Sequence, residues 1–301
     1  MIGILWDKLD SKIKCKLCLH KCLLKEGQKG ICKVRIVENG NLIVKNFMKI
    51  SYEEKSIEDT YLYHFYPFSK VLEVYTLGNN LNTEFFSVNE KDLKKINSEE
   101  FVNSISNEIK AIVFSFEESL MSIETVYRLG KLLNRAGFKN VFTTNAYFSS
   151  NLVKFISKYF EVARIVVYNS LDKNFYSKLG VKNFEEIYKT ITYLYRQMRH
   201  VEVLNFIDRN NDIKSFSEFL VSLSSSIPMH IITKNLEIFE IQNFKELAEK
   251  SGLRFVYSLD LMEINTKCYN CGNVVIDRIN GKIDVENNRC KYCGARINLV
   301  V

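Results

Sequence analysis

Eight cysteines, gathered near the two ends of the chain, constrain the fold more than any other feature of the sequence. They form two sets of four, and residues 33–267 contain none: Cys15, Cys18, Cys22 and Cys32, then Cys268, Cys271, Cys290 and Cys293. Each set begins with a Cys-x-x-Cys pair, which suits a tetrahedral thiolate site better than scattered core cysteines. Disulfides are less favoured, because no secretion signal indicates an oxidising compartment. We therefore expect two metal sites, both with zinc.

The C-terminal set is typical of a zinc ribbon. Cys268-Tyr-Asn-Cys271-Gly and Cys290-Lys-Tyr-Cys293-Gly each put two sulfurs on one tight turn, and the VVIDRINGKIDV segment between them predicts a hairpin that turns at residues 280–281. A closed four-thiolate site leaves no open position for catalysis. A structural zinc is the expectation, and iron in a rubredoxin-like site is the alternative.

The N-terminal set, CKLCLHKCLLKEGQKGIC, is less regular. Its spacing differs from the ferredoxin run, so it favours zinc over an iron–sulfur cluster. His20 is a spare ligand if one cysteine is not used, although we expect it to be a bystander.

Composition sets only wide limits on the number of domains, the location of the protein and its partners. The chain has 301 residues, 47% of them hydrophobic, and a formal charge of +7. Such a chain can bury a substantial core as one large domain with small appendages, or as two domains. No stretch approaches the roughly 20 apolar residues of a membrane span, which predicts a cytoplasmic protein. The modest positive charge permits an acidic partner or nucleic acid without indicating either.

Short, nearly continuous apolar runs alternate with amphipathic segments between the cysteine sets. The predicted strands are Val71–Thr76, Ala111–Phe116, Asn140–Thr144, Ala163–Tyr168, His200–Ile207, Pro228–Thr233 and Arg254–Ser258. This repeat predicts an α/β fold with a parallel sheet. A partial (β/α) TIM-like barrel is favoured over an open doubly wound sheet, because no Gly-rich phosphate fingerprint follows the first strand.

The amphipathic segments predict helices with one apolar face. Such faces are formed by Val126, Leu129 and Leu133, and by Phe184, Ile187, Ile191, Leu194 and Met198. Gly137 and Gly252 stand where helices should end, each just before a strand.

The loop after the first predicted strand, within VLEVYTLGNNLNTEFF, carries three asparagines: Asn79, Asn80 and Asn82. Loops at such strand ends often carry chemistry. This one offers no obvious nucleophile, metal ligand or phosphate cradle.

Three blocks resemble one family. CKLCLHKCLLKEGQKGICKVR, YLYHFYPFSKVLEVYTLG and GLRFVYSLDLMEINTKCYNCG are similar, in that order, to the AmmeMemoRadiSam-type radical SAM proteins, relatives of the pyruvate formate-lyase activating enzymes. The resemblance covers nearly the whole chain. It implies an N-terminal cysteine-rich module (1–50), a radical-SAM-like barrel (51–262) and a C-terminal zinc ribbon (263–301).

The resemblance also suggests what the asparagine-containing loop corresponds to in the family. In that family the loop carries Cys-x3-Cys-x2-Cys, which holds a [4Fe–4S] cluster that binds S-adenosylmethionine. Asn79, Thr83 and Phe86 stand at the three cysteine positions, and none can replace a thiolate on iron. The loop thus resembles a cluster loop that has lost its cluster, so neither the cluster nor S-adenosylmethionine is expected.

Other family positions are partly retained. The resemblance places Glu118 near the methionine end of the cofactor, but we favour a structural role, in which Glu118 caps a helix or solvates a rim. Asn145 falls in a family Thr-Asn-Gly loop and is expected to be a turn residue. His64, His200 and His230 are expected to be structural histidines rather than acids or bases. A family Asp-Leu-Lys segment becomes residues 168–170 here, which removes both charges.

Three functions follow, in order of preference. The first is a non-catalytic, zinc-containing binding or auxiliary protein, expected to have a protein partner. An active radical SAM relative and a protein substrate of such a relative are candidates, and a small ligand kept in the old pocket is the alternative. The second is a radical enzyme that uses iron bound by the N-terminal cysteines, whose position before the barrel is an objection. The third is nucleic-acid binding through basic residues of the ribbon, namely Lys267, Arg278, Lys282, Arg289, Lys291 and Arg296.

Overall fold

The computed structural model describes residues 1–83, 89–115 and 118–301, which form two compact units. The first comprises Met1–Lys55, Lys70–Ile165 and Tyr176–Arg199. The second comprises Ser56–Ser69, Val166–Phe175 and His200–Val301. These units do not test the predicted domain boundaries, which stay predictions.

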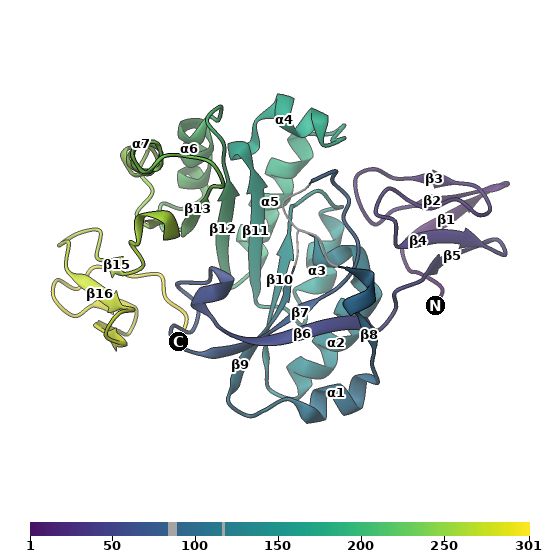
Figure 1. Cartoon of the computed structure of the whole chain (residues 1–301), viewed down its shortest axis with the longest axis horizontal. Coiled ribbons are helices and arrows are strands. Elements are labelled where there is room, and N and C mark those ends of the chain that lie inside the picture. The colour runs from purple at the N-terminus through teal and green to yellow at the C-terminus, as the bar shows by residue number, and fades with distance from the viewer. Residues whose placement is uncertain (84–88, 116–117) are drawn as a thin grey trace. The chain divides into compact units, whose positions relative to one another are not determined.

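A largely parallel sheet forms the centre of the first unit (Figure 1). Its strands follow the order β8, β6, β7, β9, β10, β11, with bounds Lys94–Lys95, Lys49–Ser56, Lys70–Tyr75, Ile109–Ser115, Lys139–Thr144 and Val162–Tyr168. The four strands from β7 to β11 are parallel, whereas β8 pairs antiparallel with β6. The four parallel strands are buried along most of their length, as nearly continuous apolar runs predict.

Helices of the first unit bury the predicted apolar faces. They are α1 (Ser98–Ser104), α2 (Ile123–Arg135), α3 (Asn151–Ile156) and α5 (Glu185–Gln197). In α2, Val126, Leu129 and Leu133 are all fully buried. Gly137 follows α2 with a φ of +92°, a left-handed conformation that favours glycine at a helix end. The predicted helix stop is therefore confirmed.

The N-terminal module, residues 1–50, belongs to the first unit. It contains a three-stranded antiparallel sheet, of β1 (Trp6–Leu9), β2 (Lys12–Cys15) and β3 (Leu23–Leu24), and a hairpin of β4 (Arg35–Glu38) and β5 (Asn41–Val44). Arg35 forms a buried ion pair with Glu124 of α2 and donates to the Ile4 carbonyl at 2.8 Å. This pair fastens the module to the helix layer.

Three parallel strands form the sheet of the second unit: β12 (His200–Phe206), β13 (Met229–Ile232) and β14 (Val256–Tyr257). Helices α6 (Ile213–Leu223) and α7 (Ile238–Lys250) lie between them in sequence, and Gly252 ends α7 with a φ of +106°. A short helix, α4 (Lys173–Lys178), belongs in part to each unit. All seven predicted strands are thus confirmed, except that Phe116 lies outside the described residues.

The C-terminal residues of the second unit form small antiparallel sheets (yellow in Figure 1). One contains β15 (Thr266–Lys267), β16 (Val274–Asp277) and β17 (Lys282–Ile283), and the other β18 (Val285–Glu286) and β19 (Arg289–Cys290). The predicted hairpin is confirmed, because Asp277 pairs with Lys282 across the turn at Gly281. No helix among the described residues has the length and apolar character needed to span a bilayer.

Candidate functional site

The loop after β7 is held together by its own amide groups. The Asn79 Nδ2 donates to Thr83 Oγ1 at 2.9 Å, and its Oδ1 accepts from the Leu81 backbone N–H at 2.9 Å. Phe86, the third predicted cluster position, lies outside the described residues. Two of the three positions that would carry thiolates in the family are therefore hydrogen-bonded to each other.

The neighbouring Asn80 joins this loop to the loop after β10. Its side chain is fully buried and donates to the Tyr147 carbonyl at 2.8 Å, while its Oδ1 accepts from Asn145 Nδ2 at 2.7 Å. Asn145 Oδ1 also accepts from the Tyr147 N–H at 3.0 Å, which confirms the predicted turn. The imidazole Nε2 of His20 lies 2.6 Å from the Asn80 carbonyl. The side chains of Asn80 and Asn145 thus connect the two loops.

Glu118 lies beside this network, buried within the protein. Its carboxyl group bonds Thr144 Oγ1 at 2.5 Å and accepts from the backbone N–H groups of Leu120 and Asn145, both at 3.2 Å. The Leu120 bond caps a 3-10 turn, Ser119–Ser122, which was the alternative role considered for Glu118. Burial raises the pKa of Glu118 to about 8. Contact of Glu118 with a bound cofactor stays a prediction.

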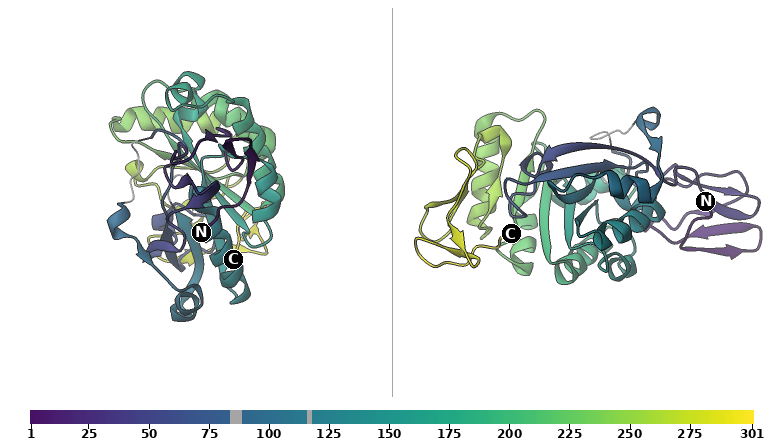
Figure 2. Two further views of the ribbon diagram at one scale, coloured as in Figure 1. Left: turned by 90° about the vertical axis from the view of Figure 1, so that its right-hand side faces the viewer. Right: turned by 90° about the horizontal axis from the view of Figure 1, so that it is seen from below.

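The N-terminal module lies beside the sheet of the first unit (purple in Figures 1 and 2) and contacts the loops that follow β7 and β10. Cys18 forms an isolated β-bridge with Phe148, and the backbone N–H of Leu19 donates to Tyr147. On the β7 side, Gly78 is packed so closely that a Cβ there would lie 3.0 Å from Val34. The module thus contacts two loops at these strand ends, and an iron site on its cysteines stays a prediction.

Three of the N-terminal cysteines, Cys15, Cys18 and Cys32, are buried, and Cys22 is half-buried. A Cβ on Gly30 would lie 3.7 Å from Cys32 Sγ and 3.9 Å from Cys22 Sγ, so those two sulfurs border one space. Burial raises the pKa of the Cys18 thiol, and the neighbouring thiols raise it further. Among the described residues, the group of side chains placed to hold a metal ion is the C-terminal one, and the N-terminal cysteines do not form such a group. The N-terminal metal site stays a prediction.

The C-terminal cysteines come together as predicted. The four Sγ atoms of Cys268, Cys271, Cys290 and Cys293 all lie within 4.8 Å of one another. The Cys268–Cys293 and Cys271–Cys290 sulfurs are 3.6 and 3.8 Å apart. A tetrahedral site with Zn–S bonds of about 2.3 Å needs sulfurs about 3.8 Å apart, so the donor set fits a zinc ion. This group can hold a metal.

A second buried network, in the second unit, was not predicted. Glu202 on β12 is fully buried and accepts four N–H groups: His200 Nε2 and His230 Nε2, both at 2.9 Å, and the backbone N–H groups of Tyr63 and His64 at 3.0 and 2.8 Å. Burial alone would raise the pKa of this carboxyl, but hydrogen bonds from the two histidines hold it well below its usual range. A carboxylate in a predicted buried strand, two positions after a histidine, was the available signal.

The three histidines around Glu202 are buried and hydrogen-bonded, as expected of structural histidines. His64 Nδ1 lies 2.7 Å from the Asn298 carbonyl and its Nε2 2.7 Å from the Tyr257 hydroxyl. Burial lowers the pKa of His64 to about 3. His200 Nδ1 is buried and has no partner among the described residues. The network therefore binds the His64 segment to β12 and to the C-terminal residues.

A third buried network lies on the sheet of the first unit. Glu73 of β7 and Arg164 of β11 form an ion pair at 3.2 Å, and both side chains are less than one-tenth exposed. Burial opposes ionisation of Glu73, but Arg164, together with hydrogen bonds from Lys55 and Ser115, holds its pKa at about 2. No local sequence pattern indicates this pair, because the two residues are 91 positions apart.

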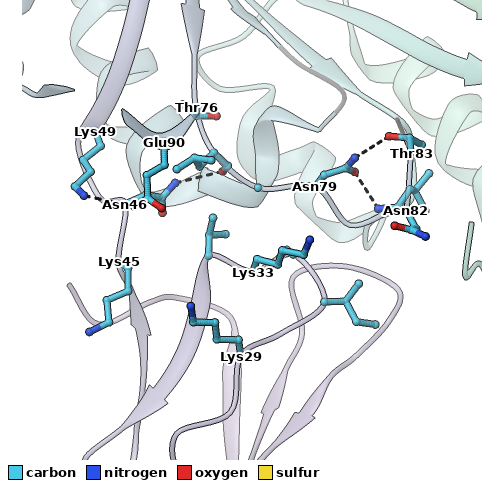
Figure 3. A pocket seen from close by; sticks show the side chains of 16 residues that line it. Lys29, Lys33, Lys45, Asn46, Lys49, Thr76, Asn79, Asn82, Thr83 and Glu90 are labelled. Carbon is cyan, nitrogen blue, oxygen red and sulfur yellow. Dashed lines mark hydrogen bonds and ion pairs between the residues drawn. The ribbon is translucent and has the colours of Figure 1, made fainter. Parts of the chain in front are cut away.

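A cavity of about 860 Å³ lies between the N-terminal module and the loop after β7 (Figure 3). Its lining combines Lys29, Lys33, Lys45, Lys49, Asn46, Thr76, Asn79, Asn82, Thr83 and Glu90 with Ile31, Cys32, Val34, Leu77, Gly78 and Leu81. Asn79 and Thr83, which the resemblance aligns with cluster cysteines, therefore line a cavity, whereas Glu118 is not among its lining residues. Sequence reasoning did not identify the lysines.

Comparisons with known proteins give one relative along the full length. The uncharacterized protein MJ0808 of Methanocaldococcus jannaschii is 27% identical over 334 aligned residues, which cover 99% of each chain. No family model matches the chain.

Similarity to solved structures is partial. TYW1 with a lysine-pyruvate adduct bound has a TM-score of 0.44 at 15% identity, over 60% of this chain and 73% of that one. A domain of the pyruvate-formate lyase-activating enzyme from Bacteroides vulgatus has a TM-score of 0.41 at 19% identity, over 50% and 98% of the two chains. Archaeal TYW1 has a TM-score of 0.41 at 16% identity, over 60% and 72%.

Proposed function

We propose that this chain is a radical-SAM-like protein that has lost the loop cluster and acts as a zinc-containing binding or auxiliary protein. The observation that carries the proposal is the hydrogen bonding of the loop after β7. Asn79 and Thr83 are bonded to each other, and Asn80 is bonded to Asn145 and Tyr147. Amide and hydroxyl groups of this kind do not bind iron–sulfur clusters, which are held by thiolates.

The two cysteine sets supply the proposed metal content. Four converging thiolates in the ribbon suit a structural zinc, which contributes to folding and does no chemistry. The N-terminal set is proposed to hold a second zinc. The proposed partner is a protein, with an active radical SAM relative as the first candidate.

Nucleic-acid binding through the ribbon has less support. Arg278, one of the six basic residues on which that hypothesis depends, donates to the carbonyls of Tyr63 and Ile264 and packs over the Tyr63 ring. Lys282 is paired with Asp284 at 2.8 Å. Both cations are already engaged within the protein, which reduces the basic surface available to phosphates.

A radical enzyme with an N-terminal cluster is the second candidate, and one observation favours it. Cys32 lines the same cavity as Asn79 and Thr83. In the resembled family, the cluster is bound by the loop after the first barrel strand. A cluster on the N-terminal cysteines of this chain would border the same cavity as that loop.

Metal stoichiometry of protein purified without oxygen tests both candidates. We expect about two zinc ions per chain and no iron. Roughly three to four iron atoms per chain, with an EPR signal after dithionite reduction, would overturn the proposed function and establish the second candidate. As a further test, the combined Asn79→Cys, Thr83→Cys and Phe86→Cys variant should gain iron that the parent protein lacks.

A further inference from the structure

We propose that the cavity beneath the N-terminal module binds a phosphate-bearing small molecule, whose anionic group is held by Lys29 and Lys33. This inference deepens the binding role proposed above and rests on it. It names the ligand class from the charge, shape and lining of the cavity.

The charge of the lining is strongly positive. Four lysines border the cavity, and Glu90 is the one acidic residue among the described lining residues. Lys49 lies 3.7 Å from Glu90, and Lys45 pairs with Glu38 at 2.6 Å. In the part of the chain that the structure describes, Lys29 and Lys33 have no such carboxylate partner. They are therefore the ammonium groups available to a ligand.

The arrangement of the lining gives these lysines polar neighbours. Figure 3 shows Lys29 and Lys33, from the N-terminal module, on the side of the cavity opposite Asn79, Asn82 and Thr83. Ammonium groups are point-charge donors that suit phosphate oxygens, and amide or hydroxyl groups can complete the hydrogen bonds. An anion between the two sides would meet donors from both.

The remaining lining is apolar. Val34 and Leu81 are buried at the cavity, and Ile31 contributes an exposed side chain. Small-molecule sites typically occupy about 300–1,000 Å³ and combine apolar walls with a few placed polar groups. A concave site of this size suits a compact molecule with an apolar or planar body rather than the flat, extended contact of a nucleic-acid backbone.

The same charges disfavour S-adenosylmethionine. That molecule carries a sulfonium and an ammonium against one carboxylate, so it enters any site as a net cation. Like charges within a few ångströms oppose binding, and the penalty increases as water is excluded. If the cavity derives from a cofactor site, its preferred ligand charge has been reversed.

Calorimetric titration of the full-length protein with inorganic pyrophosphate and with ADP tests the proposal. We expect saturable binding of at least one probe, and the double variant Lys29→Glu/Lys33→Glu should weaken it roughly tenfold or more. The matched control is Lys21→Glu/Lys25→Glu, which changes two exposed lysines of the same module outside the cavity lining. The control has the same net charge and keeps all eight cysteines, so it accounts for general electrostatics and for chelation of zinc by the probes.

The outcomes of this titration test the proposed ligand class independently of the proposed function. ADP binding without pyrophosphate binding, lost in the cavity variant alone, supports the proposal and shows that the nucleoside contributes. Absence of binding by both probes, equal weakening in both double variants, or binding of S-adenosylmethionine in their place would overturn it. None of these results alters the zinc and iron content, on which the proposed function is tested separately.

Discussion

The side-chain amide of Asn145 donates to the buried Oδ1 of Asn80 at 2.7 Å, although the two residues are 65 positions apart. Asn80 in turn donates to the Tyr147 carbonyl. One residue thus ties the loop after β7 to the loop after β10, in the region where the family resemblance places a metal cluster.

Replacing Asn80 should show how much its hydrogen bonds stabilise the protein. Asn80→Ala leaves the Asn145 amide and the Tyr147 carbonyl without their buried partner, and we expect a loss of about 2–3 kcal/mol in the free energy of unfolding, measured with urea. The control is Asn82→Ala, an exposed residue of the same loop, which should change stability by less than about 0.5 kcal/mol. Equal effects would contradict the structural role of Asn80.

Glu118 should make stability fall as the pH rises. Burial raises its pKa from 4.5 to about 8, so between these values the folded state holds a proton that the unfolded state has released. Stability therefore decreases with pH in this window, by up to about 1.4 kcal/mol per unit. Glu118→Gln mimics the protonated acid and should remove the dependence.

Urea unfolding at several pH values from 6 to 8 measures this effect. The difference in free energy of unfolding between Glu118→Gln and the parent should grow with pH in favour of the variant. Glu54→Gln changes an exposed residue of the same unit. Its free energy of unfolding should vary with pH in the same way as that of the parent protein. Parallel curves for all three proteins would show that Glu118 ionises normally.

The buried pair of Arg35 and Glu124 should control attachment of the N-terminal module. Both side chains are about 1% exposed, so Glu124→Gln leaves an uncompensated guanidinium in the interior. We expect a loss of about 3–5 kcal/mol and faster hydrogen exchange across residues 1–50. Asp7→Asn, which breaks the exposed pair with Lys16, should cost less than about 1 kcal/mol. A similar response to both changes would contradict this assignment.

Glu202 should be essential to the second unit. Glu202→Gln puts an amide donor among four N–H groups that need an acceptor, and we expect a loss of at least about 2 kcal/mol in the free energy of unfolding. Glu218→Gln on α6 is the comparison, because Glu218 has only a 3.9 Å contact with Lys214. If the two variants unfold at the same urea concentration, the network does not stabilise the unit.

Removing one thiolate should empty the ribbon site. Cys268→Ser should lower the zinc content by about one ion per chain and increase hydrogen exchange in β16 and β17, because structural zinc is coupled to folding. Tyr292→Phe, on the second Cys-x-x-Cys turn, removes only the hydroxyl bonded to Asp284 and should retain the metal. Unchanged zinc in Cys268→Ser would refute the four-thiolate assignment.

Local patterns predicted much of the fold. Apolar runs placed the strands, the spacing of Val126, Leu129 and Leu133 placed a helix face, and the two Cys-x-x-Cys turns placed a site whose sulfurs converge. Each of these features depends on residues that are close together in the chain. Backbone geometry and side-chain periodicity are therefore enough to predict it.

Tertiary structure alone decided the position of the N-terminal module, the acceptor role of Glu202 and the lysine-lined cavity. Lys29 and Lys33 line the same cavity as Asn79 and Thr83, and Arg35 of their module pairs with Glu124, 89 positions away. Such contacts depend on how separately formed elements pack. Sequence determined which elements exist and where thiolates gather, whereas packing decided which charges face one another, because a side chain's electrostatic environment is set by neighbours in space.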